Sequence, residues 1–319
     1  MIVDWVFEDG LMHRVIKVRH STDRRRNRMK LKESLDKKRF VVTSEIQSPV
    51  DGGPEALIKS LELIRGRVDG VAVPELDIEG VVGDSITTCH LLNQNRFESI
   101  YQTTTRDKSR PQLQKDLILA HDAGVENLLV FTEDYRITGD SLQEMMFFHV
   151  DAGKLASVLE HMRQGSTVDG KELPSRADFV LGSGVESGWG KNVPELEIKE
   201  MEEMMRIGTG YFLTTPVFDL PRFEKFMKQV NTFGIPVIAE VMILRTAGMA
   251  QFLNRHFKSG LIPDWMIKRL ASAPDRQKAS IEIFAETVQG LKDLCQGIHI
   301  IAMGGEEKLR LYLDAAKLR

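Results

Sequence analysis

Short apolar runs rich in β-branched residues alternate with amphipathic helical segments eight times along the chain. Val, Ile, Phe and Thr suit strands whose faces are both covered. Strands and helices that alternate in this way require a parallel sheet, because parallel neighbours need a crossover connection. Eight such units favour a single closed (β/α)8 TIM barrel, an α/β fold, over an open doubly wound sheet. The strands are expected at residues 40–46, 69–73, 99–104, 127–132, 178–182, 211–215, 236–242 and 298–303.

The domain organisation follows from the same pattern. Residues 1–26 mix Trp5 and Phe7 with charges and are predicted to be an N-terminal extension packed on the outside of the fold. Residues 27–319 are predicted to form the barrel as one domain, which begins with a basic helical run at residues 27–39. Its helices are expected at residues 54–65, 79–93, 109–123, 151–164, 194–207, 219–232, 263–293 with a break at Pro274, and 305–317.

Composition excludes several function classes. The 319 residues carry a formal net charge of -3, which gives no electrostatic reason to expect nucleic acid or an anionic membrane as a partner. No apolar run reaches the length of a membrane span, and acidic residues interrupt the first apolar residues. Cys89 and Cys295 are too far apart for a CxxC motif, and the eight histidines form no metal-binding pair. A cytoplasmic protein without a metal site is the expectation.

Several predicted strands end in polar residues, at the end of a barrel where active sites lie. The first strand delivers Glu45, which is either a catalytic acid or a structural carboxylate that caps the next helix. The fourth strand leads into Asp134, which either faces a cationic heterocycle or caps a turn. Asp107 is expected to cap the helix that begins near Ser109.

Long connections and glycines cluster at this same end. The connections at about residues 133–150, 183–193 and 243–262 exceed the usual spacing, and long ordered loops are usually functional. Residues 182–184 (GSG) and 188–190 (GWG) are interpreted as a glycine-rich loop after strand five, which indicates either a mobile lid or a close approach of the backbone to a ligand. Gly304 and Gly305 follow strand eight, where barrels often bind phosphate, or they only start the last helix.

Several stretches together resemble one family, methylenetetrahydrofolate reductase. They are residues 40–49 (FVVTSEIQSP), 105–134, 208–219 (GTGYFLTTPVFD) and 262–266 (IPDWM). Residues 148–185 are similar to the form of this reductase that is fused to homocysteine methyltransferase. The resemblance runs in order from about residue 30 to residue 319, which makes it more specific than any one motif.

The resemblance implies a (β/α)8 barrel that reduces 5,10-methylenetetrahydrofolate to 5-methyltetrahydrofolate, commonly through FAD that NAD(P)H has reduced. It implies a folate substrate and a homo-oligomer in one-carbon metabolism. Glu45 matches the acid that activates the folate, and Asp134 matches the aspartate between folate and flavin. Gln102, Thr215 and Phe218 then line the pterin pocket. The implied cofactor-binding residues are Thr104, Thr132, Asp151, Gly182 and Gly184.

The chain departs from the family pattern on the cofactor side. Thr215 replaces the pterin-binding glutamine, and Gln102 stands where many members have a histidine against the flavin. Thr132 and Glu133 replace the usual pair before the strand-four aspartate. The helix before strand six carries Glu202, Glu203 and Met204 where the family supplies cations to the FAD diphosphate, and a carboxylate there repels it.

Three functions therefore remain open. The first is a reductase, with hydride from FAD or directly from NAD(P)H. The second is a folate-binding subunit or sensor that has little activity of its own and works with a separate redox partner protein. The third is a pterin-dependent methyltransferase on the same class of barrel.

Overall fold

Eight parallel strands close into one barrel in the computed structural model, in the order β11-β12-β13-β14-β3-β4-β7-β8. The structure describes residues 2–8, 11–17, 30–46, 53–75, 77–78, 81–82, 84–105, 108–131, 137–138, 141–142, 151–187, 194–256, 261–303 and 306–318. The predicted (β/α)8 fold is confirmed. The barrel strands are β3 (Val41–Glu45), β4 (Gly70–Pro74), β7 (Ser99–Thr103), β8 (Asn127–Val130), β11 (Val180–Val185), β12 (Thr209–Pro216), β13 (Val237–Met242) and β14 (Gly297–Ile301).

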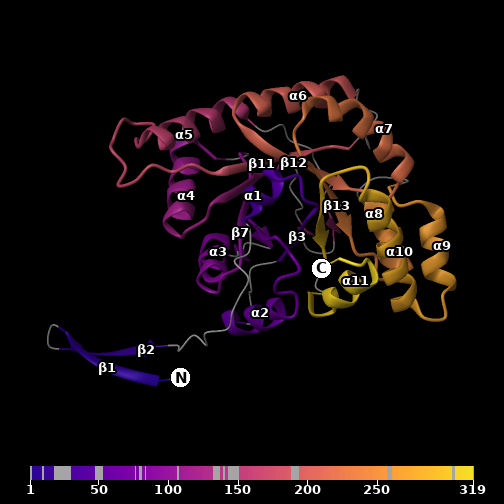
Figure 1. Cartoon of the computed structure of the whole chain (residues 1–319), viewed down its shortest axis with the longest axis horizontal. Helices are drawn as coiled ribbons and strands as arrows, with labels where there is room; N and C mark the ends of the chain where they lie inside the picture. Colours follow the sequence, from indigo (N-terminus) through magenta and orange to yellow (C-terminus); the bar gives the residue numbers. More distant parts are fainter. Residues whose placement is uncertain are drawn as a thin grey trace.

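Helices surround these strands (Figure 1). Each predicted helix has a counterpart, and the longest predicted one divides at Pro274 into α9 and α10, because a residue before proline avoids the helical conformation. The helices around the barrel are α2 (Gly53–Glu62), α3 (Ser85–Gln94), α4 (Arg110–Asp122), α5 (Ala152–Gln164), α6 (Pro194–Arg206), α7 (Leu220–Val230), α8 (Ala247–His256), α9 (Asp264–Ser272), α10 (Arg276–Leu291) and α11 (Leu309–Ala315). Short 3-10 helices η1 (Asn231–Phe233) and η2 (Glu306–Lys308) precede β13 and α11.

Alternate residues of each strand face two separate apolar layers. Val42, Ile298 and Ile300 pack with the surrounding helices, whereas Val41 and Ile238 belong to a smaller cluster inside the barrel. Helix α1 (Leu31–Asp36) contributes Leu31 and Leu35 to this inner cluster, next to the start of β3. Helix α1 therefore closes the amino-terminal end of the barrel, and the carboxyl end is left for the site.

Several element boundaries differ from the sequence prediction. Helix α3 begins at Ser85 rather than residue 79, because the Asp84 side chain caps it by accepting from the Thr87 N–H. The segment before it forms the short hairpin β5 (Asp77–Ile78) and β6 (Val81–Val82). The connection at residues 133–150 contains another short hairpin, β9 (Ile137–Thr138) and β10 (Ser141–Leu142), and α8 occupies much of the connection at residues 243–262.

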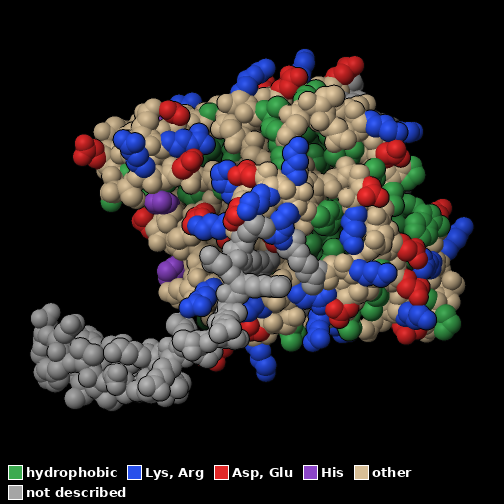
Figure 2. All heavy atoms as spheres, in the orientation of Figure 1, with side chains coloured by type: hydrophobic (Ala, Val, Ile, Leu, Met, Phe, Trp, Pro, Cys, Tyr) green, Lys and Arg blue, Asp and Glu red, His purple; other side chains and the backbone are tan. Residues whose placement is uncertain are grey.

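The N-terminal extension contains the hairpin β1 (Ile2–Glu8) and β2 (Leu11–Lys17), paired antiparallel from Ile2 opposite Lys17 to Glu8 opposite Leu11. Its packing on the outside of the barrel stays a prediction. On the face shown in Figure 2, acidic and basic side chains are interspersed over the described surface. None of the helices in the described part of the chain is long and apolar enough to cross a membrane.

Candidate active site

Glu45 lies at the carboxyl end of β3 and faces the barrel interior, in a row with two buried polar residues. Val41, Thr43 and Glu45 alternate on the inner side of the strand, and Thr43 is opposite His299 of β14 in the parallel register. The Thr43 hydroxyl and His299 Nδ1 are 2.8 Å apart, and His299 Nε2 is 4.0 Å from Glu45 Oε2. The His299 side chain is 2% exposed and the Glu45 side chain 19% exposed. A row of polar side chains therefore leads from the buried Thr43 and His299 to a carboxyl that is partly exposed.

Sequence reasoning missed Thr43 and His299. The signal was present, since His299 stands between two isoleucines of a predicted strand, and Ile298 and Ile300 occupy the outer layer. By alternation, the imidazole must then face inward. A search for histidine pairs with metal-ligand spacing does not detect a single histidine of this kind. No group of metal-ligating side chains occurs among the described residues.

Two predicted pterin-binding residues also face the mouth of the barrel. Gln102 follows the buried Tyr101 on β7, and within the described part of the chain its Oε1 is buried without a hydrogen-bond partner. A ligand donor would satisfy this oxygen, because an unpaired buried acceptor is costly. Thr215 near the end of β12 is buried, and its Oγ1 lies 3.3 Å from the Ser187 N–H nitrogen and 3.2 Å from Ser187 Oγ. Thr215 therefore anchors the end of β11 in addition to any contact with a ligand.

Gly182 and Gly184 lie within β11, so their assignment to a loop after strand five is wrong. A Cβ at Gly182 would overlap the Tyr211 ring, and one at Gly184 would approach the Phe131 ring to 2.9 Å. Both rings belong to the inner cluster, so each glycine makes room for an aromatic side chain inside the barrel. Packing against these rings explains why both positions are glycine. A contact of either glycine with a cofactor stays a prediction.

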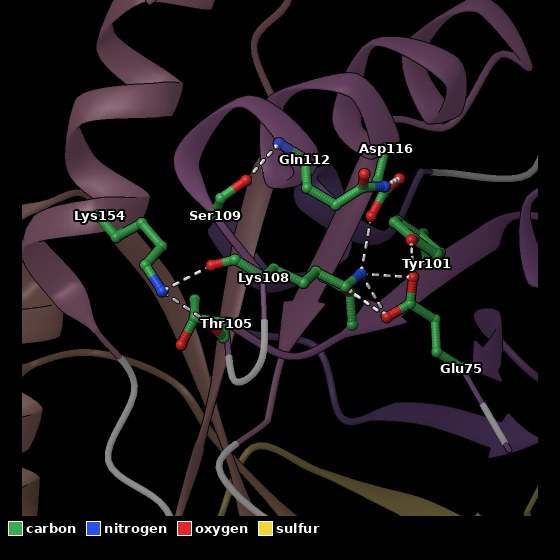
Figure 3. Close-up of polar contacts among 9 residues, drawn as sticks. Glu75, Tyr101, Thr105, Lys108, Ser109, Gln112, Asp116 and Lys154 are labelled. Carbon is green, nitrogen blue, oxygen red and sulfur yellow. Dashed lines mark hydrogen bonds and ion pairs between the residues drawn. The ribbon is translucent and has the colours of Figure 1, made fainter.

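A polar network ties together the ends of β4 and β7 on the outer side of the barrel (Figure 3). The Lys108 ammonium lies 2.7 Å from both Glu75 carboxylate oxygens, 2.9 Å from Thr103 Oγ1 and 2.9 Å from Asp116 Oδ2. The Tyr101 hydroxyl also donates to Glu75. Burial, followed by the Glu75 charge, raises the pKa of Tyr101. Because Thr103 is held on the outside, its neighbours Gln102 and Thr104 are fixed on the inside.

Asp151 has a structural role that the sequence did not indicate. It is exposed and caps α5, where its side chain accepts from the Lys154 N–H at 2.8 Å. Its own N–H donates to Thr105 Oγ1 at 3.0 Å, and Lys154 Nζ donates to the carbonyls of Thr105 and Lys108 (Figure 3). The start of α5 is thereby joined to the segment after β7. Whether Asp151 also touches a cofactor stays a prediction.

The remaining predicted site residues are dispersed. Phe218 is buried in a second cluster with Leu253 of α8 and Met266 of α9, beside the mouth. Thr104 directly follows β7, at the rim of the barrel. Helix α4 is capped by Ser109 and not by the predicted Asp107, because the Ser109 hydroxyl oxygen accepts from the Gln112 N–H. The others lie outside the described residues: Asp134, Thr132, Gly304, Gly305 and Asp107.

Comparison with known proteins identifies the family. The sequence profile described as methylenetetrahydrofolate reductase matches residues 30–317. The chain belongs to the methylenetetrahydrofolate reductase family. Its domain therefore indicates a methylenetetrahydrofolate reductase-like function, that of an oxidoreductase acting on folate. A search of the curated proteins finds no match.

Solved structures support the fold alone. Tryptophan synthase from Mycobacterium tuberculosis, in an open form with BRD0059 bound, is similar with a TM-score of 0.51 and 12% identity over 90% of this chain and 96% of that chain. A ligand-free form with a TrpA-G66V mutation gives a TM-score of 0.50, again with 12% identity over 90% and 96% of the two chains. At this identity the likeness is one of barrel architecture.

Members of the methylenetetrahydrofolate reductase family usually bind FAD, but helix α6 does not fit its diphosphate. The helix contains five glutamates against Lys199 and Arg206. Among the side chains of this helix that the structure describes, Glu197 is 8% exposed, Met201 and Met204 are buried, and Met205 packs against the same core. The two buried methionines belong to the main hydrophobic core. A carboxylate and two thioethers give a diphosphate no charge-assisted hydrogen bond.

Proposed function

We propose that this chain transfers a hydride to the methylene bridge of 5,10-methylenetetrahydrofolate and releases 5-methyltetrahydrofolate. The observation that carries the proposal is the row Thr43, His299 and Glu45 inside the mouth of a barrel of this family. Opening the five-membered ring that holds the methylene carbon needs a proton donor. Glu45 is the carboxyl at the rim that can reach a bound pterin.

The proton step follows from the placement of these groups. Glu45 in its protonated form gives its proton to the ring nitrogen of the folate, and the carbon–nitrogen bond to the methylene opens to an iminium cation. The carboxylate left on Glu45 and its buried surroundings stabilise that cation, because a charge interaction is stronger where water is excluded. Hydride from a reduced donor then adds to the methylene carbon. Asp134, predicted to stand by the cation as well, lies outside the described residues.

Positioning of the folate is assigned to side chains around Glu45. Gln102 offers a buried amide oxygen, and the pterin ring carries N–H donors that would satisfy it. Thr215 is two residues beyond Leu213 of the inner cluster and lines the same side of β12. Phe218, in the neighbouring cluster, would support the pocket from the side of α8.

The hydride donor is where this chain departs from its family. The acidic helix α6 favours direct transfer from NAD(P)H, or electrons from a separate redox partner, over a tightly held FAD. Absorbance of the purified protein near the flavin bands, with and without added FAD, decides this. A colourless protein that still oxidises NAD(P)H with methylenetetrahydrofolate supports direct hydride transfer. A protein that is purified with FAD bound contradicts direct transfer.

A variant at Glu45 separates the reductase from a folate-binding subunit. In Glu45→Gln the proton donor is lost while the shape is kept, so turnover should fall by roughly 10²–10⁴-fold. Folate affinity, measured by calorimetry, should change little in the same variant. A matched control is Glu282→Gln, since Glu282 lies on α10 and pairs with Arg269 of α9. A wild-type protein that binds folate but forms no methyl product would establish the binding subunit instead.

The proposal also covers the location, the assembly and the partners of the protein. We propose a cytoplasmic homo-oligomer that takes a small folate substrate and no nucleic acid. Methyl transfer to an acceptor in the absence of any hydride donor would instead revive the pterin-dependent methyltransferase.

A further inference from the structure

Two buried polar side chains inside the barrel contact each other next to Glu45. Thr43 on β3 and His299 on β14 are opposite each other in the parallel register, and both alternate with residues of the outer layer. Each of the two residues is 2% exposed. The proposed proton step uses Glu45 and gives Thr43 and His299 no task. What they can do depends on which of their atoms carry protons.

The Thr43 hydroxyl has a single proton and two acceptors nearby. His299 Nδ1 is 2.8 Å from Thr43 Oγ1, and the Ile298 carbonyl oxygen is 3.4 Å from it. Hydroxyl groups donate over roughly 2.5–3.0 Å, so the Thr43 proton is directed to Nδ1. A ring nitrogen that accepts carries no proton, and a neutral imidazole then has its proton on the other nitrogen. This contact therefore makes His299 a neutral imidazole with a proton on Nε2.

The Nε2–H of His299 is then a buried donor within reach of Glu45. Among the described residues, Nε2 has no hydrogen-bond partner. A buried N–H without an acceptor is costly. Glu45 Oε2 lies 4.0 Å away, and a hydrogen bond needs roughly 2.7–3.2 Å. The Glu45 side chain is 19% exposed and flexible, so rotation of its carboxyl can close this gap.

The strands on either side of β3 offer Glu45 no other polar side chain on the inner face. Ala72 of β4 is opposite Glu45 in the register and belongs to the inner cluster. Apart from His299, the inner positions of β4 and β14 are occupied by residues without a hydrogen-bonding side chain, namely Gly70, Ala72, Pro74, Gly297 and Ile301. His299 is therefore the polar neighbour that these two strands give to Glu45.

We propose that His299 is a positioning residue that acts through Glu45, and that Thr43 fixes the tautomer it needs. When folate is bound, Nε2–H of His299 donates to Oε2 of the Glu45 carboxyl, and the acid proton of Glu45 resides on Oε1. That proton passes from Oε1 to the folate ring nitrogen as the carbon–nitrogen bond opens. The carboxylate that remains keeps the hydrogen bond from Nε2. His299 retains its own proton throughout, and water returns one proton to Glu45 after the product has left.

This inference rests on the proposed reductase function, because it concerns the acid of that reaction. The tautomer of His299 can be measured without turnover, in the whole wild-type protein with histidine labelled at its ring nitrogens. Nitrogen NMR at neutral pH should show a proton on Nε2 and none on Nδ1. The His299 signals are identified by their absence from His299→Gln, or by their shift in Thr43→Ser. A proton on Nδ1 alone, or on both nitrogens, overturns the inference.

Substitutions at Thr43 distinguish positioning from packing. Thr43→Val keeps the shape without the hydroxyl, so kcat should fall roughly tenfold or more, the effect of one hydrogen bond, while KM for the folate stays within about twofold. Thr43→Ser keeps the hydroxyl and should retain kcat within about threefold. If Thr43 only fills space, Val retains kcat and Ser, which lacks the methyl group, loses it. That order overturns the inference.

A matched control for Thr43→Val is Thr287→Val. Thr287 is also a buried threonine, and its hydroxyl donates to the Ile283 carbonyl within α10, outside the barrel. The kcat of Thr287→Val should equal that of wild type. A similar fall of kcat in Thr287→Val and Thr43→Val would assign the effect to general loss of a buried hydroxyl and overturn the inference.

Substitutions at His299 test the donor itself. His299→Leu has no donor, so kcat should fall roughly 10- to 100-fold, again with little change in KM. His299→Gln carries an amide N–H in place of Nε2–H and should have a kcat at least about fivefold above that of His299→Leu. Equal values of kcat in these two variants would assign the loss to shape and overturn the inference.

The wild-type product separates this inference from the function on which it rests. If wild type forms the methyl product, and Thr43→Val and His299→Leu keep its kcat, the inference is overturned and the reductase stands. If neither variant folds, the tautomer measured in wild type decides. A wild type that makes no methyl product overturns the proposed function and this inference with it.

Discussion

Gly182 shows how a single missing side chain shapes the interior of this barrel. The Tyr211 ring occupies the space that a Cβ at Gly182 would need. We therefore predict that Gly182→Ala lowers the free energy of unfolding by about 1–3 kcal/mol, the usual cost of overpacking. Chemical denaturation of the variant and of wild type measures this difference in the free energy of unfolding. Gly210→Ala is the matched control, because its Cβ would meet Leu181 O at an ordinary 3.6 Å.

Coupling between Gly182 and Tyr211 distinguishes a clash from a general loss of strand structure. Adding Tyr211→Leu to Gly182→Ala should cost less than the sum of the two single changes, since the smaller side chain relieves the overlap. Strict additivity would contradict this explanation. The result would also show that glycine at position 182 is required by packing before any cofactor is considered.

At the residue level, the sequence predicted the exposed end of the site better than its buried end. Glu45 was identifiable because it ends a strand, where catalytic groups of barrels lie. For His299, alternation along the strand shows only that the side chain faces inward. Which residues it meets there depends on the register that places it opposite Thr43, and register is a long-range property.

At the level of elements, the Lys108 network holds β4, β7 and α4 together. The Lys108 side chain is 15% exposed and lies between Glu75 and Asp116. Lys108→Met leaves two carboxylates facing each other, so we predict a loss of roughly 2–3 kcal/mol, between the values for surface and fully buried pairs. Adding Glu75→Gln should restore part of it. Lys32→Met, which breaks an exposed pair with Asp36, should stay within about 0.5 kcal/mol of wild type.

A second readout relates this network to the site. Lys108 donates a hydrogen bond to Thr103, the neighbour of Gln102. Loss of this hydrogen bond in Lys108→Met should make Gln102 more mobile and weaken folate binding, even in the variant protein that remains folded. Unchanged folate affinity in a destabilised variant would limit the network to stability.

Element boundaries were least predictable where local chemistry overrides periodicity. Asp84 starts α3 six residues later than the apolar pattern indicated, because a capping carboxylate defines the first turn. The glycines of β11 were interpreted as a loop because glycine has a low strand propensity. They lie within the strand, where the absence of a side chain leaves room for the neighbouring aromatic rings. Pro274 was predicted correctly because its effect on the preceding residue is local.

At the level of the whole molecule, buried thiols make stability depend on alkaline pH. Burial raises the pKa of Cys89 from 9.0 to about 12 and that of Cys295 from 9.0 to about 11. The folded state therefore keeps protons that the unfolded state releases above pH 9.0. The stabilisation is complete below that pH and is lost as the pH rises toward the folded values, by up to about 1.4 kcal/mol per pH unit for each thiol.

Urea unfolding at about pH 8 and about pH 10.5 measures this decline. The double variant Cys89→Ala and Cys295→Ala should have a flatter dependence on pH, even if its stability at about pH 8 is lower. Equal slopes in variant and wild type would contradict the assignment to the thiols. Tyr101 and Tyr211, whose pKa values burial also raises, should account for the remaining decline.

The architecture as a whole was predictable because eight strand–helix units repeat one pattern and have one common solution. At this scale, membership of the methylenetetrahydrofolate reductase family indicates a reductase-like function. The acidic helix α6 is the observation that supports our proposal of a different hydride donor. The most direct test is to supply methylenetetrahydrofolate with NAD(P)H deuterated at the transferable position and to weigh the product. We predict 5-methyltetrahydrofolate that carries one deuterium in its methyl group. The absence of any methyl product would contradict the reductase, and a methyl product without deuterium would contradict direct transfer.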